Sequence, residues 1–187
     1  MAITDLAGFM SQLKDHAVEH GLHIHDERHL VETYSLKQSW EVDLHPESSC
    51  NGPLDLQIAL EVDPRVLLGF EDAMVNAAED ADPPDGFNLE CAVSWSLPPI
   101  TEHVDLLSLT LDLAGYGGVT LPITVSAMDT FPSITDSPTR TLGVVGRYTI
   151  SLAKIYLGED VTCELLEKTT AVSTFLLDKA AQWIAQA

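Results

Sequence analysis

Residues 54–62 have the sequence LDLQIALEV, in which an apolar side chain stands at every even-numbered position. Successive side chains of a strand point to opposite sides of a sheet, so the even positions share one face, while Asp55, Gln57 and Glu61 share the other. This alternation is typical of a strand with one buried face and one solvated face. We therefore predict a strand here, and with it a half-buried antiparallel sheet.

Three helices are predicted around this strand. The first runs from about Thr4 to His20 and stops at Gly21, and the second begins at Asp63-Pro64, which has the form of an N-cap followed by the first helical position, and continues to about Asp80. The third and longest extends from a capping Asp160 to Trp183. Each carries apolar residues at helical spacing, which indicates a face packed against the sheet.

Further strands are predicted from alternation and from β-branched and aromatic content. They cover residues 28–36 and 38–44 as a hairpin, then 87–97, 119–128 and 140–152. Residues 101–114 fit two patterns, because Leu107, Leu109, Leu111 and Leu113 alternate as in a strand, whereas a capped helix ending at Gly115 fits as well. We favour the strand.

These elements predict an α+β fold. We expect an antiparallel sheet of about six or seven strands, with N-terminal, middle and long C-terminal helices packed on one face. No linker or internal repeat divides the chain, so residues 1–187 are predicted to form a single globular domain. The pattern leaves the strand order open.

The charge balance excludes some partners. Asp and Glu number 29 against 9 Lys and Arg, for a formal net charge of −20, and such a chain repels nucleic-acid phosphates and anionic lipid surfaces. Hydrophobic residues nevertheless make up 45% of the chain, which is enough for a packed core. We expect no nucleic-acid or membrane partner, and the acidity is explained by function, by solubility alone or by a halophilic source.

The chain carries the marks of a soluble cytoplasmic protein. Its first twenty residues are amphipathic and contain acidic groups, unlike a signal peptide, and no apolar run reaches the length of a membrane span. The cysteines Cys50, Cys91 and Cys163 lie far apart without a CxxC pair, so neither a disulfide framework nor a four-cysteine zinc site is indicated. Cys50 is expected in an exposed loop, and the other two as inert buried thiols.

No enzyme signature is present. The sequence contains no GxSxG, no SxxK, no P-loop and no cysteine set beside a histidine along the chain. We therefore assign no catalytic residue and no cofactor, and expect a protein that binds rather than one that catalyses.

The polar face of the predicted sheet supplies candidate partner-binding residues. Side chains on it include the carboxylates Glu41, Asp43, Asp55, Glu61 and Glu90. Together they would form an acidic plate able to steer a basic protein partner. The competing interpretation is an ordinary solvated sheet face.

Five of the seven histidines fall within residues 16–29. His16 and His20 share a helix face, and His23 and His25 would point the same way if the chain is extended after Gly21. Imidazoles on adjacent elements are ligands for zinc, nickel or copper, so His16, His20, His23 and His25 are the candidate transition-metal ligands. The spacing matches no named zinc motif, and incidental histidines at a solvated helix end explain it equally.

The order of helix, three strands, helix, strands and helix, together with the acidity, resembles the small acidic chaperones of bacterial secretion systems. The resemblance rests on element order, and this chain has extra predicted strands between Thr101 and Met128. It implies a homodimer that binds an unfolded or extended partner segment on its sheet face or helix grooves.

The expected function is that of a non-enzymatic protein-binding module, chaperone, adaptor or immunity-like, which uses an acidic surface to hold a basic or aggregation-prone protein. A homodimer is expected, with Trp183 and Ile184 as a self-association face. One alternative is a metal-dependent enzyme or metal-binding protein built on the histidine cluster. Another is a protein that holds a small apolar ligand between sheet and helices.

Overall fold

The strand predicted at residues 54–62 lies inside a six-stranded antiparallel sheet. The computed structural model describes residues 4–50, 52–78, 81–100, 103–131, 133–135 and 138–184. The strands are β1 (Leu22–Val31), β2 (Gln38–Pro46), β3 (Asp55–Val62), β4 (Asn88–Ser96), β5 (Ile123–Thr130) and β6 (Thr139–Ser151), arranged in the order β1-β2-β3-β4-β6-β5. The helices are α1 (Leu6–Glu19), the short 3-10 helix η1 (Glu47–Ser49), α2 (Pro64–Asn76), α3 (Leu106–Gly117), α4 (Leu152–Leu157) and α5 (Cys163–Ile184). The predicted α+β class and the long C-terminal helix are confirmed.

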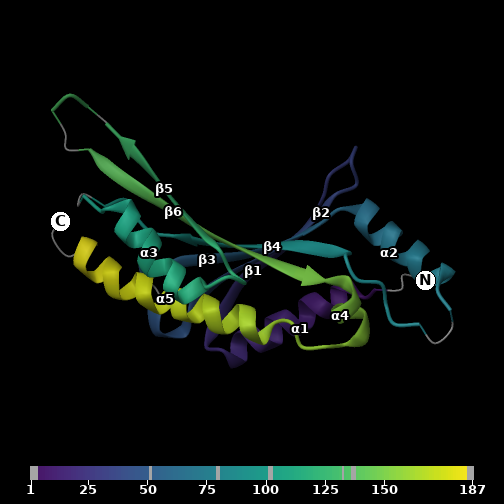
Figure 1. The fold of residues 1–187 in the computed structure, drawn as a ribbon. Coiled ribbons are helices and arrows are strands. Elements are labelled where there is room, and N and C mark those ends of the chain that lie inside the picture. Colours follow the sequence, from purple (N-terminus) through teal and green to yellow (C-terminus); the bar gives the residue numbers. More distant parts are fainter. Residues whose placement is uncertain are drawn as a thin grey trace.

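One face of the sheet forms the core. Val42, Ile58, Val93 and Gly146 are register partners across β2, β3, β4 and β6, and the three valine and isoleucine side chains are buried. Helices α1, α3 and α5 cover this face, as Figure 1 shows below the sheet. The even-numbered positions of β3 all point into this core, as the alternation predicts.

Helix α5 is attached to the sheet by more than apolar contact. Its inward stripe includes Leu165, Val172 and Leu176, all fully buried. The indole Nε1 of Trp95 on β4 donates a hydrogen bond of 2.9 Å to the hydroxyl of Ser173 on α5, and both residues are buried. A polar pair this deep in the core fixes the position of the helix against the strand, because neither group has access to water.

The middle helix, α2, lies at one end of the sheet in Figure 1. Asp63 caps it by accepting a hydrogen bond from the backbone N–H of Arg65, and Pro64 takes the first position, as predicted. Phe70 anchors it, fully buried with its ring edge-on to the rings of Phe87 and Tyr156. The helix ends at Asn76, earlier than the predicted end at Asp80, and residues 79 and 80 lie outside the described range.

The strand favoured for residues 101–114 is wrong: α3 is a helix, and residues 101 and 102 lie outside the described range. Asp105 caps it, accepting from the backbone N–H of Leu107 at 3.0 Å and from the hydroxyl of Ser108 at 2.8 Å. Leu109 and Leu113 then face the core four residues apart. The alternate leucines of this segment are compatible with a strand. The same run of leucines, with a capping residue at each end, is also compatible with a helix, and the helix forms.

The predicted first hairpin is present but longer than expected. β1 begins at Leu22, six positions before the predicted start, and pairs antiparallel with β2. The chain leaves α1 at Gly21, whose φ of 74° a glycine adopts without strain, and continues directly into the strand. His23 and His25 therefore lie on a strand, as the extended alternative required.

The opposite face of the sheet is polar. We call it the open face: no described helix lies over its central strands in Figure 1. Its central residues, in register across β2, β3, β4 and β6, are Glu41, Asp43, Asp55, Gln57, Ala59, Glu61, Glu90, Ala92, Ser94, Ser96 and Arg147. No helix among the described residues is both long enough and apolar enough to cross a membrane.

Candidate functional site

The five carboxylates predicted for partner binding all lie on the open face. Glu41 and Asp43 come from β2, Asp55 and Glu61 from β3, and Glu90 from β4. Their strand neighbours in sequence, such as Val42, Leu56 and Leu89, are buried on the other side, so the register fixes the outward direction of all five. Whether they contact a partner stays a prediction.

Arg28 neutralises part of this face. Its Nη1 lies 2.8 Å from Oδ2 of Asp43, its Nη2 donates to Asp43 Oδ1 at 2.9 Å, and its Nε donates to Glu41 Oε2 at 3.2 Å. These hydrogen bonds raise the pKa of Arg28 above its ordinary value. Burial acts to raise the pKa of Asp43, but the hydrogen bonds from Arg28 and Gln57 outweigh it, and the pKa of Asp43 is lowered.

A bulge in β1 places Arg28 on the open face. The register shifts between Ile24 and Asp26, so that Ile24 faces the core whereas Arg28, an even number of residues later, lies opposite Glu41. A regular strand would keep both on one side. The bulge also turns His29 toward the helix side, where its ring stacks on Trp40 at 3.8 Å between centroids.

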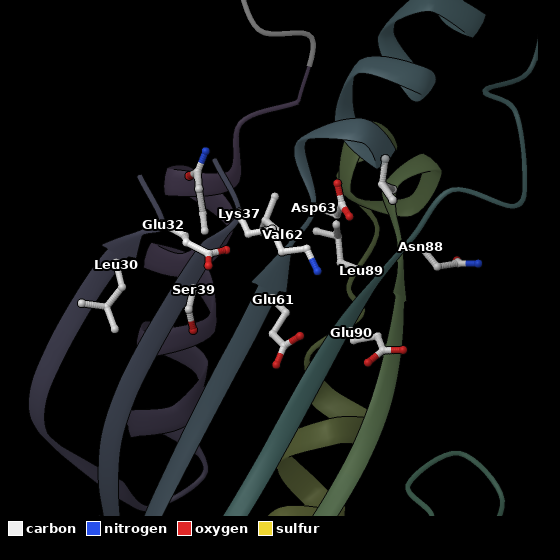
Figure 2. Close-up of a pocket in the computed structure, with 12 residues that line it drawn as sticks. Leu30, Glu32, Lys37, Ser39, Glu61, Val62, Asp63, Asn88, Leu89 and Glu90 are labelled. Atoms are coloured by element: carbon white, nitrogen blue, oxygen red, sulfur yellow. The ribbon is translucent and has the colours of Figure 1, made fainter. Parts of the chain in front are cut away.

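A groove of about 500 Å³ lies on the open face at the end of β3 nearest α2. Its lining combines carboxylates with apolar residues and a single cation, the ammonium of Lys37. The acidic lining residues are Glu32, Glu61, Asp63 and Glu90, and the apolar ones are Leu30, Val62, Val66 and Leu89. Figure 2 shows these side chains around the ends of β1 to β4.

Glu61 and Glu90 are directly opposite each other in this groove, as register partners on β3 and β4. Figure 2 shows both side chains on the same side of the sheet. The described residues supply Glu90 with one ion pair, to Arg147 at 3.6 Å between exposed side chains, and Glu61 with none. Like charges opposite each other in a sheet destabilise it, and a nearby cation would reduce the repulsion between these two carboxylates.

A second hollow, of about 550 Å³, lies at the other end of β3. Asp43, Asp55, Gln57, Ser94 and Ser96 line it, and the imidazole of His25 forms part of its edge. It continues the open face toward the histidines, so that the face offers two recesses, each containing at least two carboxylates.

The structure separates the four predicted metal ligands. His16 lies on α1 in one group with Asp160 and Cys163, and His23 lies on β1 in another group with His45 and Cys50. His20 forms the C-cap of α1, and His25 lies in the bulge with its ring 4.1 Å from that of His45. Neither of these two groups joins His16 to His23, and a single site made of all four histidines stays an untested prediction.

Sequence reasoning missed His45 and Cys50. His45 Nε2 lies 3.2 Å from the Sγ of Cys50, and His23 Nδ1 lies 3.3 Å from the same sulfur. His45 is 7% exposed, and burial first, then the neighbouring His25 and His23, lower its pKa. Two features of the sequence could have indicated this cluster. His45 and Cys50 stand on either side of a short loop, and the strand that pairs with the strand of His45 contains the His-x-His pattern of residues 23–25.

The group around His16 is explained by the start of α5. Asp160 accepts hydrogen bonds from the backbone N–H groups of Thr162 at 2.9 Å and Cys163 at 3.2 Å. His16 Nδ1 lies 2.6 Å from the hydroxyl of Thr162, which joins α1 to α5. The pKa of Asp160 is lowered by its hydrogen bonds to the Cys163 thiol and to these backbone groups. These residues thus already serve as a helix cap.

A small hollow of about 140 Å³ lies between α1 and the strands β1 and β2, where Met10, Trp40 and Val42 contribute apolar surface. Small-molecule sites usually measure about 300–1,000 Å³. This hollow therefore gives little support to the apolar-ligand alternative.

Comparison with protein-family models, with curated proteins and with solved structures finds no match for this chain. The function is therefore argued from the residues of the site alone.

Proposed function

We propose that the protein is a non-enzymatic binding module that holds a basic, extended segment of a partner protein on the open face. The observation that carries the proposal is the groove in which Glu61 and Glu90 lie opposite each other, with Lys37 as the only cation in its lining. A lysine or arginine side chain of the partner would relieve the repulsion between the two carboxylates.

The mixed lining of the groove suits such a side chain. Lysine and arginine bury an aliphatic stem along apolar surface and keep the charged head in a polar setting. Leu30 is 50% exposed at the rim, and Val66 on α2 is partly buried beside Glu61 and Glu90. The groove thus offers an apolar wall for the stem and carboxylates for the head.

The net charge of −20 supports the same partner class, because it attracts basic proteins over a distance and accelerates their encounter. Arg28 already pairs with Glu41 and Asp43. We therefore assign the binding of the basic segment to Asp55, Glu61 and Glu90 more than to the two β2 carboxylates.

A chaperone or adaptor role is the form of this function that we favour. The element order that resembles the secretion chaperones recurs in part, but α3 takes the place of a strand before β5, and α4 is inserted before α5. A homodimer in the cytoplasm is part of the proposal. Trp183 and Ile184, the expected self-association residues, already pack in part against the core of their own chain, so they give the dimer little support.

A metal-dependent enzyme based on His16, His20, His23 and His25 is less well supported, because His16 and His23 belong to separate groups of side chains. Elemental analysis of protein purified without an affinity tag would test it. A stoichiometric transition metal that is lost when His16 is replaced, and lost also when His23 is replaced, would favour that alternative. A metal that depends on His23 but not on His16 would count against it.

The binding test uses a fluorescent peptide that alternates lysine with small apolar residues, and a second peptide with each lysine replaced by glutamine. Fluorescence anisotropy measures binding to the native chain and to the double variant Glu61→Gln/Glu90→Gln. The matched control is Glu167→Gln/Asp178→Asn, which removes the same charge from exposed positions on α5. At about 0.5 kcal/mol for each exposed pair, the groove variant should bind about fivefold more weakly.

The expected result is salt-dependent binding of the lysine peptide, weakened by the groove variant and unchanged in the control. Equal weakening in both variants would show that net charge alone attracts the peptide, and the groove would lose its assigned role. No difference between the lysine and glutamine peptides would overturn the proposed partner class.

A further inference from the structure

Three side chains at the edge of the open face direct metal-binding atoms toward one point. The Sγ of Cys50 lies 3.3 Å from Nδ1 of His23 and 3.2 Å from Nε2 of His45. No two of the three ligand atoms are more than 4.8 Å apart. A thiol has one proton and can donate it to only one imidazole, whereas a metal ion between the three groups would engage all of them.

These spacings fit a tetrahedral ion. Zinc binds cysteine sulfur at about 2.3 Å and histidine nitrogen at about 2.0 Å, which places neighbouring nitrogen and sulfur ligands roughly 3.5 Å apart in a tetrahedron. The two observed nitrogen to sulfur distances, 3.2 and 3.3 Å, are close to that value. An ion could therefore enter with small side-chain adjustments.

The backbone holds the three residues in place before any ion binds. His23 on β1 and His45 on β2 are register partners, and their rings meet edge to face at 5.3 Å. Cys50 follows η1, and the backbone N–H of Glu47 at the start of η1 donates to the carbonyl of Gly21 at 2.8 Å, which ties the loop to the beginning of β1. Such prior ordering reduces the entropy lost on binding.

The surroundings also suit a metal. Nε2 of His23, the nitrogen that points away from Cys50, lies 3.7 Å from the carboxylate of Glu47. A carboxylate near the second ring nitrogen orients a metal-binding histidine and makes it a better ligand. His45 is buried, so its ring is held in position, and Cys50 is exposed, so an ion can reach it from solvent.

We propose that His23 Nδ1, His45 Nε2 and Cys50 Sγ form a zinc site, with a fourth position open to water or to a ligand. The ligand set of two imidazoles and one thiolate selects a soft or borderline divalent ion over magnesium or calcium. The site shares only His23 with the four histidines that the sequence suggested. It is also independent of the proposed binding of a basic segment in the groove.

Cobalt titration of the full, tag-free chain tests the site, because tetrahedral Co²⁺ reports its ligands in the absorption spectrum. We expect one Co²⁺ per chain, ligand-field bands in the visible region and a thiolate charge-transfer band in the near ultraviolet, all displaced by Zn²⁺. Cys50→Ser should abolish the charge-transfer band and weaken Zn²⁺ binding by at least about tenfold, since even lost second-shell groups cost that much.

Two variants serve as controls. Cys163→Ser removes the thiol of the group around His16, and His29→Gln removes a neighbouring β1 histidine that stacks on Trp40 away from the site. Both should leave cobalt binding unchanged. Cys50 is exposed, so Cys50→Ser should retain the fold, and circular dichroism checks this.

A second measurement follows the thiol directly. Alkylation of Cys50, read by mass spectrometry of the digested protein, should slow markedly when stoichiometric Zn²⁺ is present. Alkylation at the same rate with and without Zn²⁺, a cobalt spectrum without the thiolate band, or a band lost with Cys163→Ser in place of Cys50→Ser would each overturn the proposal.

Discussion

Glu61 and Glu90 lie directly opposite each other on β3 and β4, with both carboxylates on the open face. Cross-strand carboxylates in this position repel and destabilise the sheet, by an amount of the same order as the roughly 0.2–1 kcal/mol that favourable cross-strand pairs contribute. The sheet tolerates that cost at the groove, although Arg147 lies near enough to Glu90 to reduce it.

Glu61→Gln should therefore stabilise the free protein. The expected gain is about 0.2–1 kcal/mol in the free energy of unfolding, measured by urea denaturation at low salt, because the repulsion with Glu90 disappears. Glu167→Gln, at an exposed position on α5, is the control for the loss of one negative charge. A similar gain in both variants would mean that repulsion across the whole acidic surface, and not repulsion between Glu61 and Glu90, lowers the stability of the free protein.

Ser173→Ala should be destabilising despite its small change in volume. The variant leaves the indole N–H of Trp95 without its acceptor in the core, and an unsatisfied buried donor costs about 1–3 kcal/mol. Thermal and urea unfolding measure the loss. Thr174→Ala, which removes an exposed hydroxyl bonded to the preceding turn, should cost less than about 0.5 kcal/mol. Equal losses would show that the Trp95 contact is dispensable.

Arg28→Met should give a pH-dependent loss of stability. Arg28 holds the pKa of Asp43 below its ordinary value, so the carboxylate contributes stability above the unfolded pKa near 3.8, and this is lost as the pH falls through the lower folded pKa. The native protein should exceed the variant in stability most at neutral pH, and the difference should shrink in strongly acidic solution.

Urea denaturation of both proteins at a series of pH values measures this difference. Arg147→Met is the matched control, because its guanidinium lies on the same face but pairs with Glu90 only at 3.6 Å between exposed side chains. A stability difference for Arg28→Met that does not change with pH would remove the assigned coupling to Asp43.

The outward direction of Glu61 was predictable from local pattern alone. The alternation of residues 54–62 continues without interruption, and the buried positions of β3 follow it. The same reasoning could not place Arg28, because the bulge between Ile24 and Asp26 inverts the alternation of β1. A bulge is set by the pairing of two strands, which no single-strand pattern records.

The cluster at Cys50 shows a second limit. His23, His45 and Cys50 converge only because β1 and β2 pair in one register and η1 returns the chain to the start of β1. The sequence showed the histidines of residues 16–29 as neighbours along the chain. The strand pairing instead brought two residues from beyond that range to His23 and left His16 with α5.

Asp105 caps α3, in the segment 101–114 for which the alternation of leucines wrongly favoured a strand. Its carboxylate accepts hydrogen bonds from the N–H of Leu107 and the hydroxyl of Ser108, and these lower its pKa. Asp105→Ala should cost about 0.5–2 kcal/mol in unfolding free energy and increase amide hydrogen exchange in the first turn of α3. Asp105→Asn, which retains an accepting oxygen, should restore most of the loss. If both variants match the native protein in exchange and stability, burial of Leu109 and Leu113 alone specifies the helix.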